Sequence, residues 1–313
     1  MKKLFIIGNG FDVDHNLHTR YSDFQKYLIE SYPEASDEQL VVPSSFTMPD
    51  GDERYDDDAV VGFLLRIITD SEGTGEDWKD LENTLGNLDF SYCFDSYGYE
   101  EDDDDDGDGE EWHRIYNNED ISLNILESVK MIKEYFSDWA QTIDISSAQP
   151  KDDFSKLIDA DNDLFLTLNY TETLQRLYKA KHVFHIHGKQ GGEIVFGHGN
   201  DTDYYDTYSE HYLGAENNLC SLQSALRKDT KGIISRNKHF FKMLDTVDSI
   251  YSYGFSFSDV DMDYVKEICR VTDTSIMVWY FNDYDDEKKI NIFKEKIRNC
   301  GYKGKFDTFT IEK

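Results

Sequence analysis

The sequence is short of positive charge. It has 32 Lys and Arg residues against 64 Asp and Glu residues, which gives a formal net charge of -32. A surface of this sign repels the phosphate backbone of DNA and RNA, so the composition argues against a nucleic-acid partner. Only a local basic patch or a metal ion would reverse that effect at one site.

Long apolar runs and closely spaced cysteines are also missing. The apolar run nearest the start, residues 4–7, is too short for the core of a signal peptide or for a membrane span. The four cysteines, at positions 93, 220, 269 and 300, lack the paired spacing of a zinc knuckle or a redox dithiol. We therefore expect a cytoplasmic protein with reduced thiols, no membrane segment and no bound metal.

The chain nevertheless has the composition of a folded protein, with 20 Phe and 21 Tyr residues. Apolar runs predict buried strands at residues 4–7, 164–168, 183–187, 194–196, 249–253, 275–281 and 306–311. Helical spacing predicts helices at residues 21–31, 59–68, 78–88, 121–143, 172–178, 262–270 and 287–298. Ser22 is placed to cap the first of these helices. The alternation predicts an α/β, Rossmann-like fold with a mainly parallel sheet and helices on both faces.

A mostly helical and acidic stretch interrupts this alternation at about residues 33–160. Residues 33–54 hold three of the four prolines and predict a loop. Residues 100–111 include ten acids in twelve positions, which predicts a solvated acidic loop. The order of these acids does not match the alternating pattern of a calcium-binding loop. We expect one Rossmann domain, residues 1–313, with this stretch as an insertion.

Four unusual motifs follow predicted strands. Because the carboxyl ends of parallel strands meet at one edge of a sheet, ligands bind there. The motifs predict a nucleotide site at this edge. They are Gly8-Asn9-Gly10-Phe11-Asp12, then Asn169, then His187-Gly188, and finally Gly254-Phe255-Ser256 with Asp259 close behind.

The first motif suits a nucleotide but is not specific. Gly8 and Gly10 would let a phosphate or ribose approach backbone N–H groups, and Asp12 could accept hydrogen bonds from a ribose. The third glycine of the dinucleotide fingerprint is missing, so an ordinary turn between a strand and a helix explains the motif equally well.

The later motifs also have two interpretations each. Asn169 could orient a water or a sugar hydroxyl, or simply cap the next helix. His187 could act as a general base near neutral pH, although His187 and His185, which share a face of their predicted strand, could both be structural. Gly254 and Ser256 could surround a ribose or phosphate, whereas Asp259 could cap the helix that follows.

Together these motifs resemble the bacterial abortive-infection AbiH family. The resemblance spans the chain and rests on residues 6–12, Leu17, Thr19, residues 21–24, Trp78 with Glu82, and residues 167–171, 187–188 and 254–256. AbiH proteins are antiphage defence proteins, and their strand-end motifs in turn resemble the sirtuin-like NAD-binding fold. The resemblance implies NAD as substrate or ligand and a hydrolase that cleaves its glycosidic bond.

The resemblance also assigns roles to residues. Asn169 would position the attacking water or the ribose, and His187 would act as base or ribose ligand. The nucleotide would be held by Gly8, Asn9, Gly10 and Asp12, with Gly254, Ser256 and Asp259 toward its adenosine end.

Two other functions stay open. The same pocket would serve a non-catalytic nucleotide sensor, and Glu82, Asp259 and Asp261 would be the acids of a metal-dependent nuclease. The partners implied are a nucleotide, a phage-derived or defence-system protein as activator, and a second copy of the chain.

Overall fold

The computed structural model describes residues 2–37, 40–72, 78, 80–95, 108–282 and 286–311. The chain forms two compact units. The first consists of Met1–Arg20, Trp139–Val195 and Lys228–Lys313, and the second of Tyr21–Asp138 and Phe196–Arg227. The second unit thus combines most of the stretch expected as an insertion with a later segment. That the whole chain is a single domain stays a prediction.

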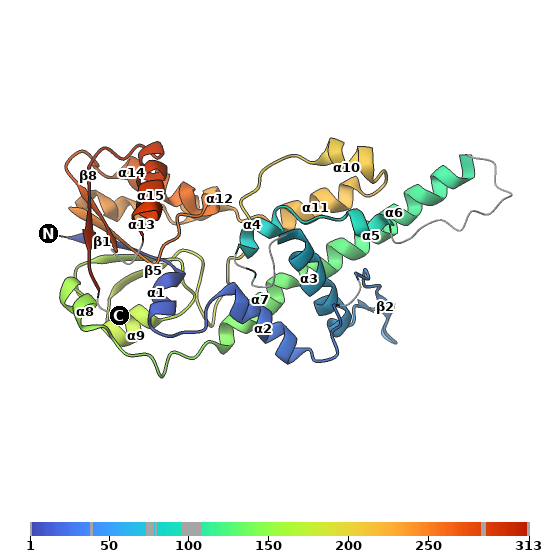
Figure 1. Ribbon diagram of the computed structural model, residues 1–313, viewed down its shortest axis with the longest axis horizontal. Coiled ribbons are helices and arrows are strands. Elements are labelled where there is room, and N and C mark those ends of the chain that lie inside the picture. The colour runs from blue at the N-terminus through green and yellow to red at the C-terminus, as the bar shows by residue number, and fades with distance from the viewer. Residues whose placement is uncertain are drawn as a thin grey trace. The chain divides into compact units, whose positions relative to one another are not determined.

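The first unit is built on a six-stranded sheet (Figure 1). Its strands are β1 (Lys3–Ile7), β4 (Leu164–Thr167), β5 (His182–His185), β6 (Ser249–Tyr253), β7 (Val278–Asn282) and β8 (Lys305–Phe309). They lie in the order β5-β4-β1-β6-β7-β8, and every pairing is parallel. On each side of β1, strands that come later in the sequence lie farther from it. This is a doubly wound order, and the direction of the strand order reverses between β1 and β6. The predicted α/β, Rossmann-like fold is confirmed.

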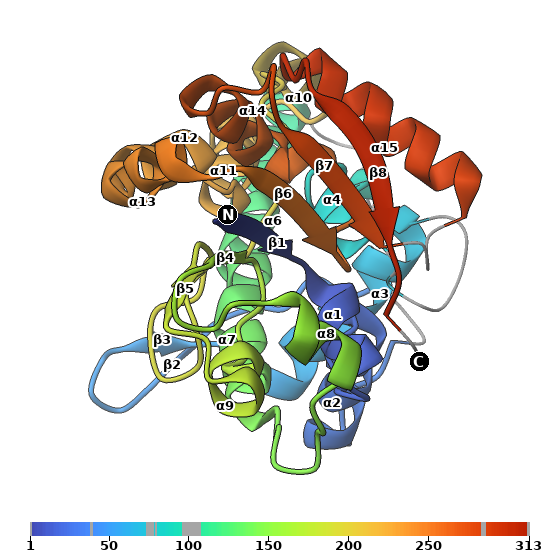
Figure 2. The ribbon, with the colours of Figure 1, turned by 90° about the vertical axis from the view of Figure 1, so that its left-hand side faces the viewer.

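Strand β1 is apolar from Leu4 to Ile7 because both of its faces are covered. Leu4 and Ile6 belong to one core and Phe5 and Ile7 to another. Figure 2 shows helices on both sides of the sheet. The first core contains residues of α12 (Thr230–Arg236), α13 (Lys238–Lys242), 3-10 helix η1 (Met243–Thr246), α14 (Met262–Val271) and α15 (Glu287–Asn299). The second contains residues of α1 (Asn9–Asp14), α8 (Asp152–Leu157) and α9 (Thr173–Tyr178).

Two predicted strands of this unit need correction. The strand expected over residues 183–187 ends at His185, and His187 lies in the turn that follows. The turn forms because Gly188 has a φ of +78°, a conformation that favours glycine. His185 and His187 therefore do not share a strand face. The strand expected over residues 194–196 is reduced to an isolated antiparallel bridge between Ile194 and Gly188.

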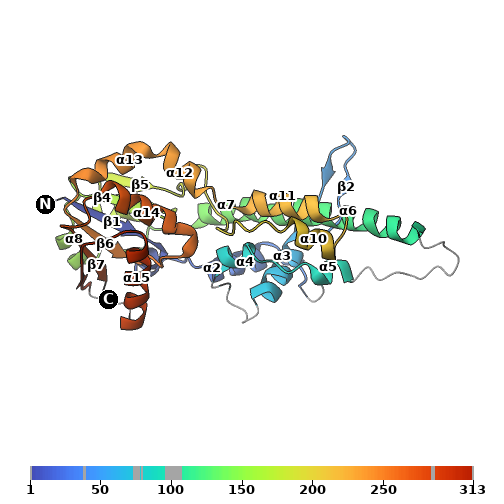
Figure 3. The same ribbon diagram turned by 90° about the horizontal axis from the view of Figure 1, so that it is seen from above.

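The second unit is mainly helical (Figure 3). Its helices are α2 (Tyr21–Ser31), α3 (Asp57–Glu72), α4 (Leu81–Leu85), α5 (Ser91–Asp95), α6 (Asp108–Lys130), the start of α7 (Ile132–Thr142), α10 (Tyr205–His211) and α11 (Glu216–Leu226). A short antiparallel pair, β2 (Phe46–Thr47) and β3 (Glu53–Arg54), lies within the predicted loop of residues 33–54. The core of the second unit includes Phe24, whose ring packs edge-on against the rings of Trp78 and Phe136.

Several helix boundaries of this unit also differ from those predicted. Ser22 does not cap α2, because the helix already begins at Tyr21. Trp78 lies before α4 with a φ of +44°, so the helix expected over residues 78–88 is shorter. The helix expected over residues 121–143 is interrupted at Met131. Of the acidic run, residues 100–107 lie outside the described residues, and Asp108 begins α6.

No helix among the described residues has both the length and the apolar character that a bilayer crossing requires.

Candidate functional site

The loops that follow β1 and β6 pack directly against each other. Gly8 donates its backbone N–H to the Tyr253 carbonyl at 3.0 Å, and Gly10 donates to the Gly254 carbonyl at 3.0 Å. A Cβ on Gly8 would lie 2.4 Å from the Gly254 oxygen, and one on Gly254 would lie 2.2 Å from the Phe11 nitrogen. These glycines therefore allow two backbones to meet at the point where the strand order reverses.

The first motif, which the sequence also allowed as a turn between a strand and a helix, forms the start of the helix itself. Gly8 is the residue before α1, and Asn9 and Gly10 form its first turn. Asn9 is exposed, and its Nδ2 donates to the Thr19 carbonyl at 2.8 Å. The turn directs Asp12 inward, where its side chain is 1% exposed.

Asp12 is a buried carboxyl with one oxygen held and one without a partner. The Thr171 hydroxyl donates to Oδ2 at 2.6 Å, and Thr171 Oγ1 is 2.9 Å from Thr173 Oγ1. Oδ1 has no hydrogen-bond partner among the residues that the structure describes. Burial raises the pKa of Asp12 to about 6, against the opposing effect of Thr171, Thr173 and Asn169. Asp12 is therefore mostly ionised at pH 7, yet far more basic than an ordinary aspartate.

Asn169 follows β4 and is only 6% exposed. Its backbone N–H donates to Thr167 Oγ1 at 3.1 Å, and its carbonyl accepts from His185 Nδ1 at 2.9 Å. Within the described ranges, its side-chain Nδ2 has no hydrogen-bond partner. The alternative that Asn169 caps the next helix is wrong, because Glu172 occupies the cap position of α9.

His187 belongs to a second buried group. Its Nε2 lies 3.2 Å from Tyr264 Oη and 3.4 Å from Asp261 Oδ1, and Lys228 Nζ donates to the same Asp261 oxygen at 3.4 Å. Burial and the Lys228 charge lower the pKa of His187, with Asp261 opposing them. Burial alone would raise the pKa of Asp261, but Lys228 and His187 hold it at about 2. At neutral pH, His187 is therefore neutral and Asp261 ionised.

The residues expected at the adenosine end are less enclosed. Ser256 is exposed on the loop after β6. The Asp259 side chain is 93% exposed and pairs with Lys296 of α15 at 2.8 Å. Asp259 does not cap α14, because it begins 3-10 helix η2 (Asp259–Asp261) and Asp261 directly precedes α14. Its contact with a nucleotide stays a prediction.

The structure thus sorts the predicted residues into two groups. Asn169 lies with Asp12, whereas His187 lies with Asp261. Sequence reasoning missed Lys228 and the role of Asp261 beside His187. A tyrosine one helical turn from Asp261 gives no distinct signal, and Lys228 belongs to no motif. Sequence reasoning considered Asp261 only as an acid of a metal-dependent nuclease.

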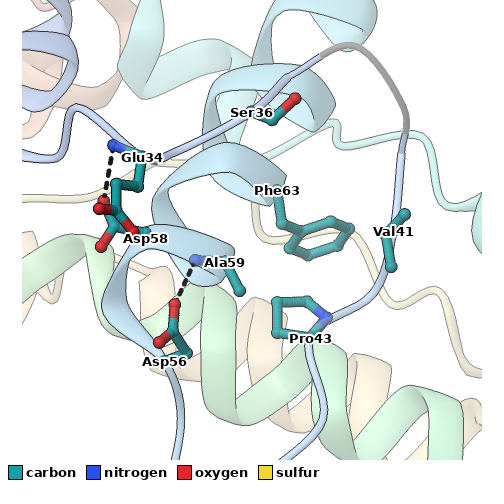
Figure 4. A pocket seen from close by; sticks show the side chains of 8 residues that line it. All are labelled: Glu34, Ser36, Val41, Pro43, Asp56, Asp58, Ala59 and Phe63. Carbon is teal, nitrogen blue, oxygen red and sulfur yellow. Dashed lines mark hydrogen bonds between the residues drawn. The ribbon is translucent and has the colours of Figure 1, made fainter.

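A pocket of about 510 Å³ lies in the second unit, outside these groups (Figure 4). It is lined by the apolar Val41, Pro43 and Phe63 and by three acids. Two of these acids already accept backbone hydrogen bonds: Asp56 from Ala59, and Asp58 from Glu34. Across the described part of the chain, no group of three His, Cys, Asp or Glu side chains is close enough to hold a metal ion.

The family model of bacteriophage abortive infection AbiH matches residues 4–283. The chain belongs to the AbiH family. Neither a curated protein nor a solved structure matches it. The matched range contains both buried groups of this AbiH protein and the loops after β1 and β6. Membership supports a role in phage defence by abortive infection.

Proposed function

We propose that this AbiH protein aborts phage infection by cleaving NAD, or a related nucleotide, at its glycosidic bond. The observation that carries the proposal is the buried, unpartnered Nδ2 of Asn169 beside the unpartnered Oδ1 of Asp12. A buried polar group without a partner costs about 1–3 kcal/mol. A water or a sugar hydroxyl, which both donates and accepts, removes this cost at both atoms.

The location of this pair supports a nucleotide as the ligand. Asn169 follows β4, and Asp12 lies on the helix after β1, so both are at the carboxyl edge of the sheet beside the reversal of strand order. The N–H groups of Gly8 and Gly10 already donate within the protein. These glycines therefore allow the two loop backbones to approach each other closely. The nucleotide would be contacted instead by the exposed Asn9 and Ser256.

His187 acts in this proposal as base or ribose ligand. Its lowered pKa leaves the imidazole neutral at pH 7, so that it is able to accept a proton or a hydrogen bond. Asp261 fixes the ring through Nε2.

One observation favours the alternative of a nucleotide sensor. The Nε2 of His187 is already engaged by Tyr264 and Asp261, as in a structural network. In a sensor, the pocket would bind the nucleotide without turnover and pass the signal to a partner protein.

Nicotinamide release separates these functions. The purified chain is incubated with NAD, with and without a lysate of phage-infected cells as a source of activator, and the products are identified by chromatography. Cleavage predicts nicotinamide release that is lost in Asn169→Ala. The matched control is Asn291→Ala, an exposed position in α15.

Two results would contradict the proposal. One is the absence of nicotinamide under both conditions, and the other is unchanged release from Asn169→Ala. Binding of NAD by calorimetry without any product would favour the sensor.

A further inference from the structure

We propose that Asp12 is the catalytic base of this reaction and that Asn169 holds the water from which Asp12 takes a proton. The inference rests on the proposed function and deepens it, because it assigns the proton to a carboxylate on α1 in place of His187.

Two buried side chains first offer a donor and an acceptor to one water. Asp12 Oδ1 is an acceptor and Asn169 Nδ2 a donor, and both are buried without a hydrogen-bond partner in the described part of the chain. Asp12 is 1% and Asn169 6% exposed. Buried waters typically satisfy such otherwise unsatisfied polar groups and make about three hydrogen bonds each. A water held by these two side chains is oriented with one hydrogen toward Asp12.

The surroundings of Asp12 also fix which oxygen is free to react. Thr171 donates its hydroxyl to Oδ2 at 2.6 Å, and the hydroxyl of Thr173 lies 2.9 Å from that of Thr171. This chain of hydroxyls holds the carboxylate in one orientation and leaves Oδ1 for the water. The raised pKa of about 6 makes the carboxylate a better base than an exposed aspartate while leaving it ionised at pH 7.

His187 is less suited to take the proton. Its Nε2 lies within 3.4 Å of Asp261 Oδ1 and 3.2 Å of Tyr264 Oη, so this nitrogen is already engaged. Burial and the Lys228 charge also oppose its protonation. The role left to His187 is to bind the ribose.

The step balances in atoms and charge. The water oxygen forms a bond to the anomeric carbon of the ribose, and one water proton passes to Asp12 Oδ1. The glycosidic C–N bond breaks, and its electron pair neutralises the pyridinium nitrogen of the departing nicotinamide. ADP-ribose carries the new hydroxyl, and Asp12 then releases its proton to solvent.

The test compares Asp12→Asn, which keeps the shape but cannot accept a proton, with the exposed control Asp245→Asn of η1. A general base contributes about 100-fold or more to the rate. We expect Asp12→Asn to lower kcat for nicotinamide release by at least about 100-fold, with the calorimetric affinity for ADP-ribose within about threefold. Asp245→Asn should match the wild type in both measurements.

The pH profile and chemical rescue test the role of the carboxylate directly. In the wild type, kcat/KM should fall about tenfold per pH unit below about pH 6, the pKa of Asp12. Asp12→Asn should lack this fall. Formate should restore part of the activity of Asp12→Ala, because it supplies a carboxylate in the space that the side chain leaves.

Three outcomes would overturn the inference while leaving the proposed function intact. The first is a kcat of Asp12→Asn within about tenfold of the wild-type value. The second is a loss of ADP-ribose affinity in Asp12→Asn as large as its loss of kcat. The third is a fall of kcat/KM at low pH that persists in Asp12→Asn and disappears in His187→Gln. The second outcome would make the Asp12 water structural only. A wild type that releases no nicotinamide would instead overturn the proposed function, and this inference with it.

Discussion

The backbone N–H of Gly10 donates to the carbonyl of Gly254 at 3.0 Å, which joins the loop after β1 to the loop after β6. The two loops are 244 residues apart in sequence, from position 10 to position 254. Their contact closes the point where the strand order reverses, and it explains why both positions are glycine.

Gly254→Ala should therefore destabilise the protein strongly. Its φ of +64° disfavours a side chain, and the new Cβ would lie 2.2 Å from the Phe11 nitrogen. We expect a loss of about 3 kcal/mol in the free energy of unfolding, measured by urea denaturation. Gly301→Ala is the control, because Gly301 has a φ of +94° with nothing within 4 Å of the added Cβ. Its cost should be about 1 kcal/mol, and equal costs at the two positions would refute the packing argument.

Asp12 should make the protein less stable as the pH rises. Its pKa is about 6 in the folded state against 3.8 as the ordinary value, so between these values the folded state binds more protons than the unfolded state. The resulting stabilisation is complete below about pH 4 and is lost as the pH rises through 6. The loss amounts to about 3 kcal/mol at most.

The measurement is the free energy of unfolding of wild type and Asp12→Asn at several pH values. The difference should shift in favour of Asp12→Asn between pH 4 and pH 6 and stay constant above pH 7. Subtracting the variant removes the contribution of the other carboxylates. A difference that does not change with pH would show that Asp12 is not buried as a charge.

Asp261→Asn should destabilise the protein much more than Asp259→Asn. Asp261 is buried and shares one oxygen between Lys228 and His187, whereas the Asp259 side chain is 93% exposed beside Lys296. Removing one member of a buried ion pair costs about 3 kcal/mol, and an exposed pair contributes less than about 1 kcal/mol. Urea denaturation at pH 7 measures both, and comparable losses would contradict the buried pairing.

Asn169→Ala should abolish protection against phage while leaving the protein folded. Nδ2 has no hydrogen-bond partner among the described residues, but the Asn169 side chain also lowers the pKa of Asp12, so we expect the free energy of unfolding to fall by about 1 kcal/mol. Phage plaque counts on cells that express the variant should nevertheless rise to those of cells without the protein. Full protection by a stable Asn169→Ala variant would place the defence activity elsewhere.

The sequence predicted the sheet well because a strand that is buried on both faces appears in the sequence as a continuous run of apolar residues. Leu4 to Ile7 are all apolar, and all four are buried. The strand expected over residues 183–187 was too long because the pattern of apolar residues does not reveal the positive φ of Gly188. The helices α10, α12 and α13 were also missed, since segments of five to seven residues carry little periodicity, and so was the eleven-residue α11.

The candidate site was predicted only in part, for a related reason. Asn169 and His187 stand at strand ends and were found through them. Lys228 and Asp261 come together from positions 33 residues apart through tertiary packing alone. Asp12 was recognised as polar, but the burial that raises its pKa, and the Thr171 hydroxyl that opposes this rise, both depend on tertiary packing.

The central place of β1 also determines when the protein is able to fold during synthesis. β1 pairs with β4, about 160 residues later, and with β6, about 245 residues later. Strand β1 is synthesised before its partners and must therefore wait for residues 249–253 before both of its edges are paired. Translation that stops before β6 leaves the loop after β1 without the loop that packs against it, so an incomplete chain lacks the assembled contact between Gly10 and Gly254.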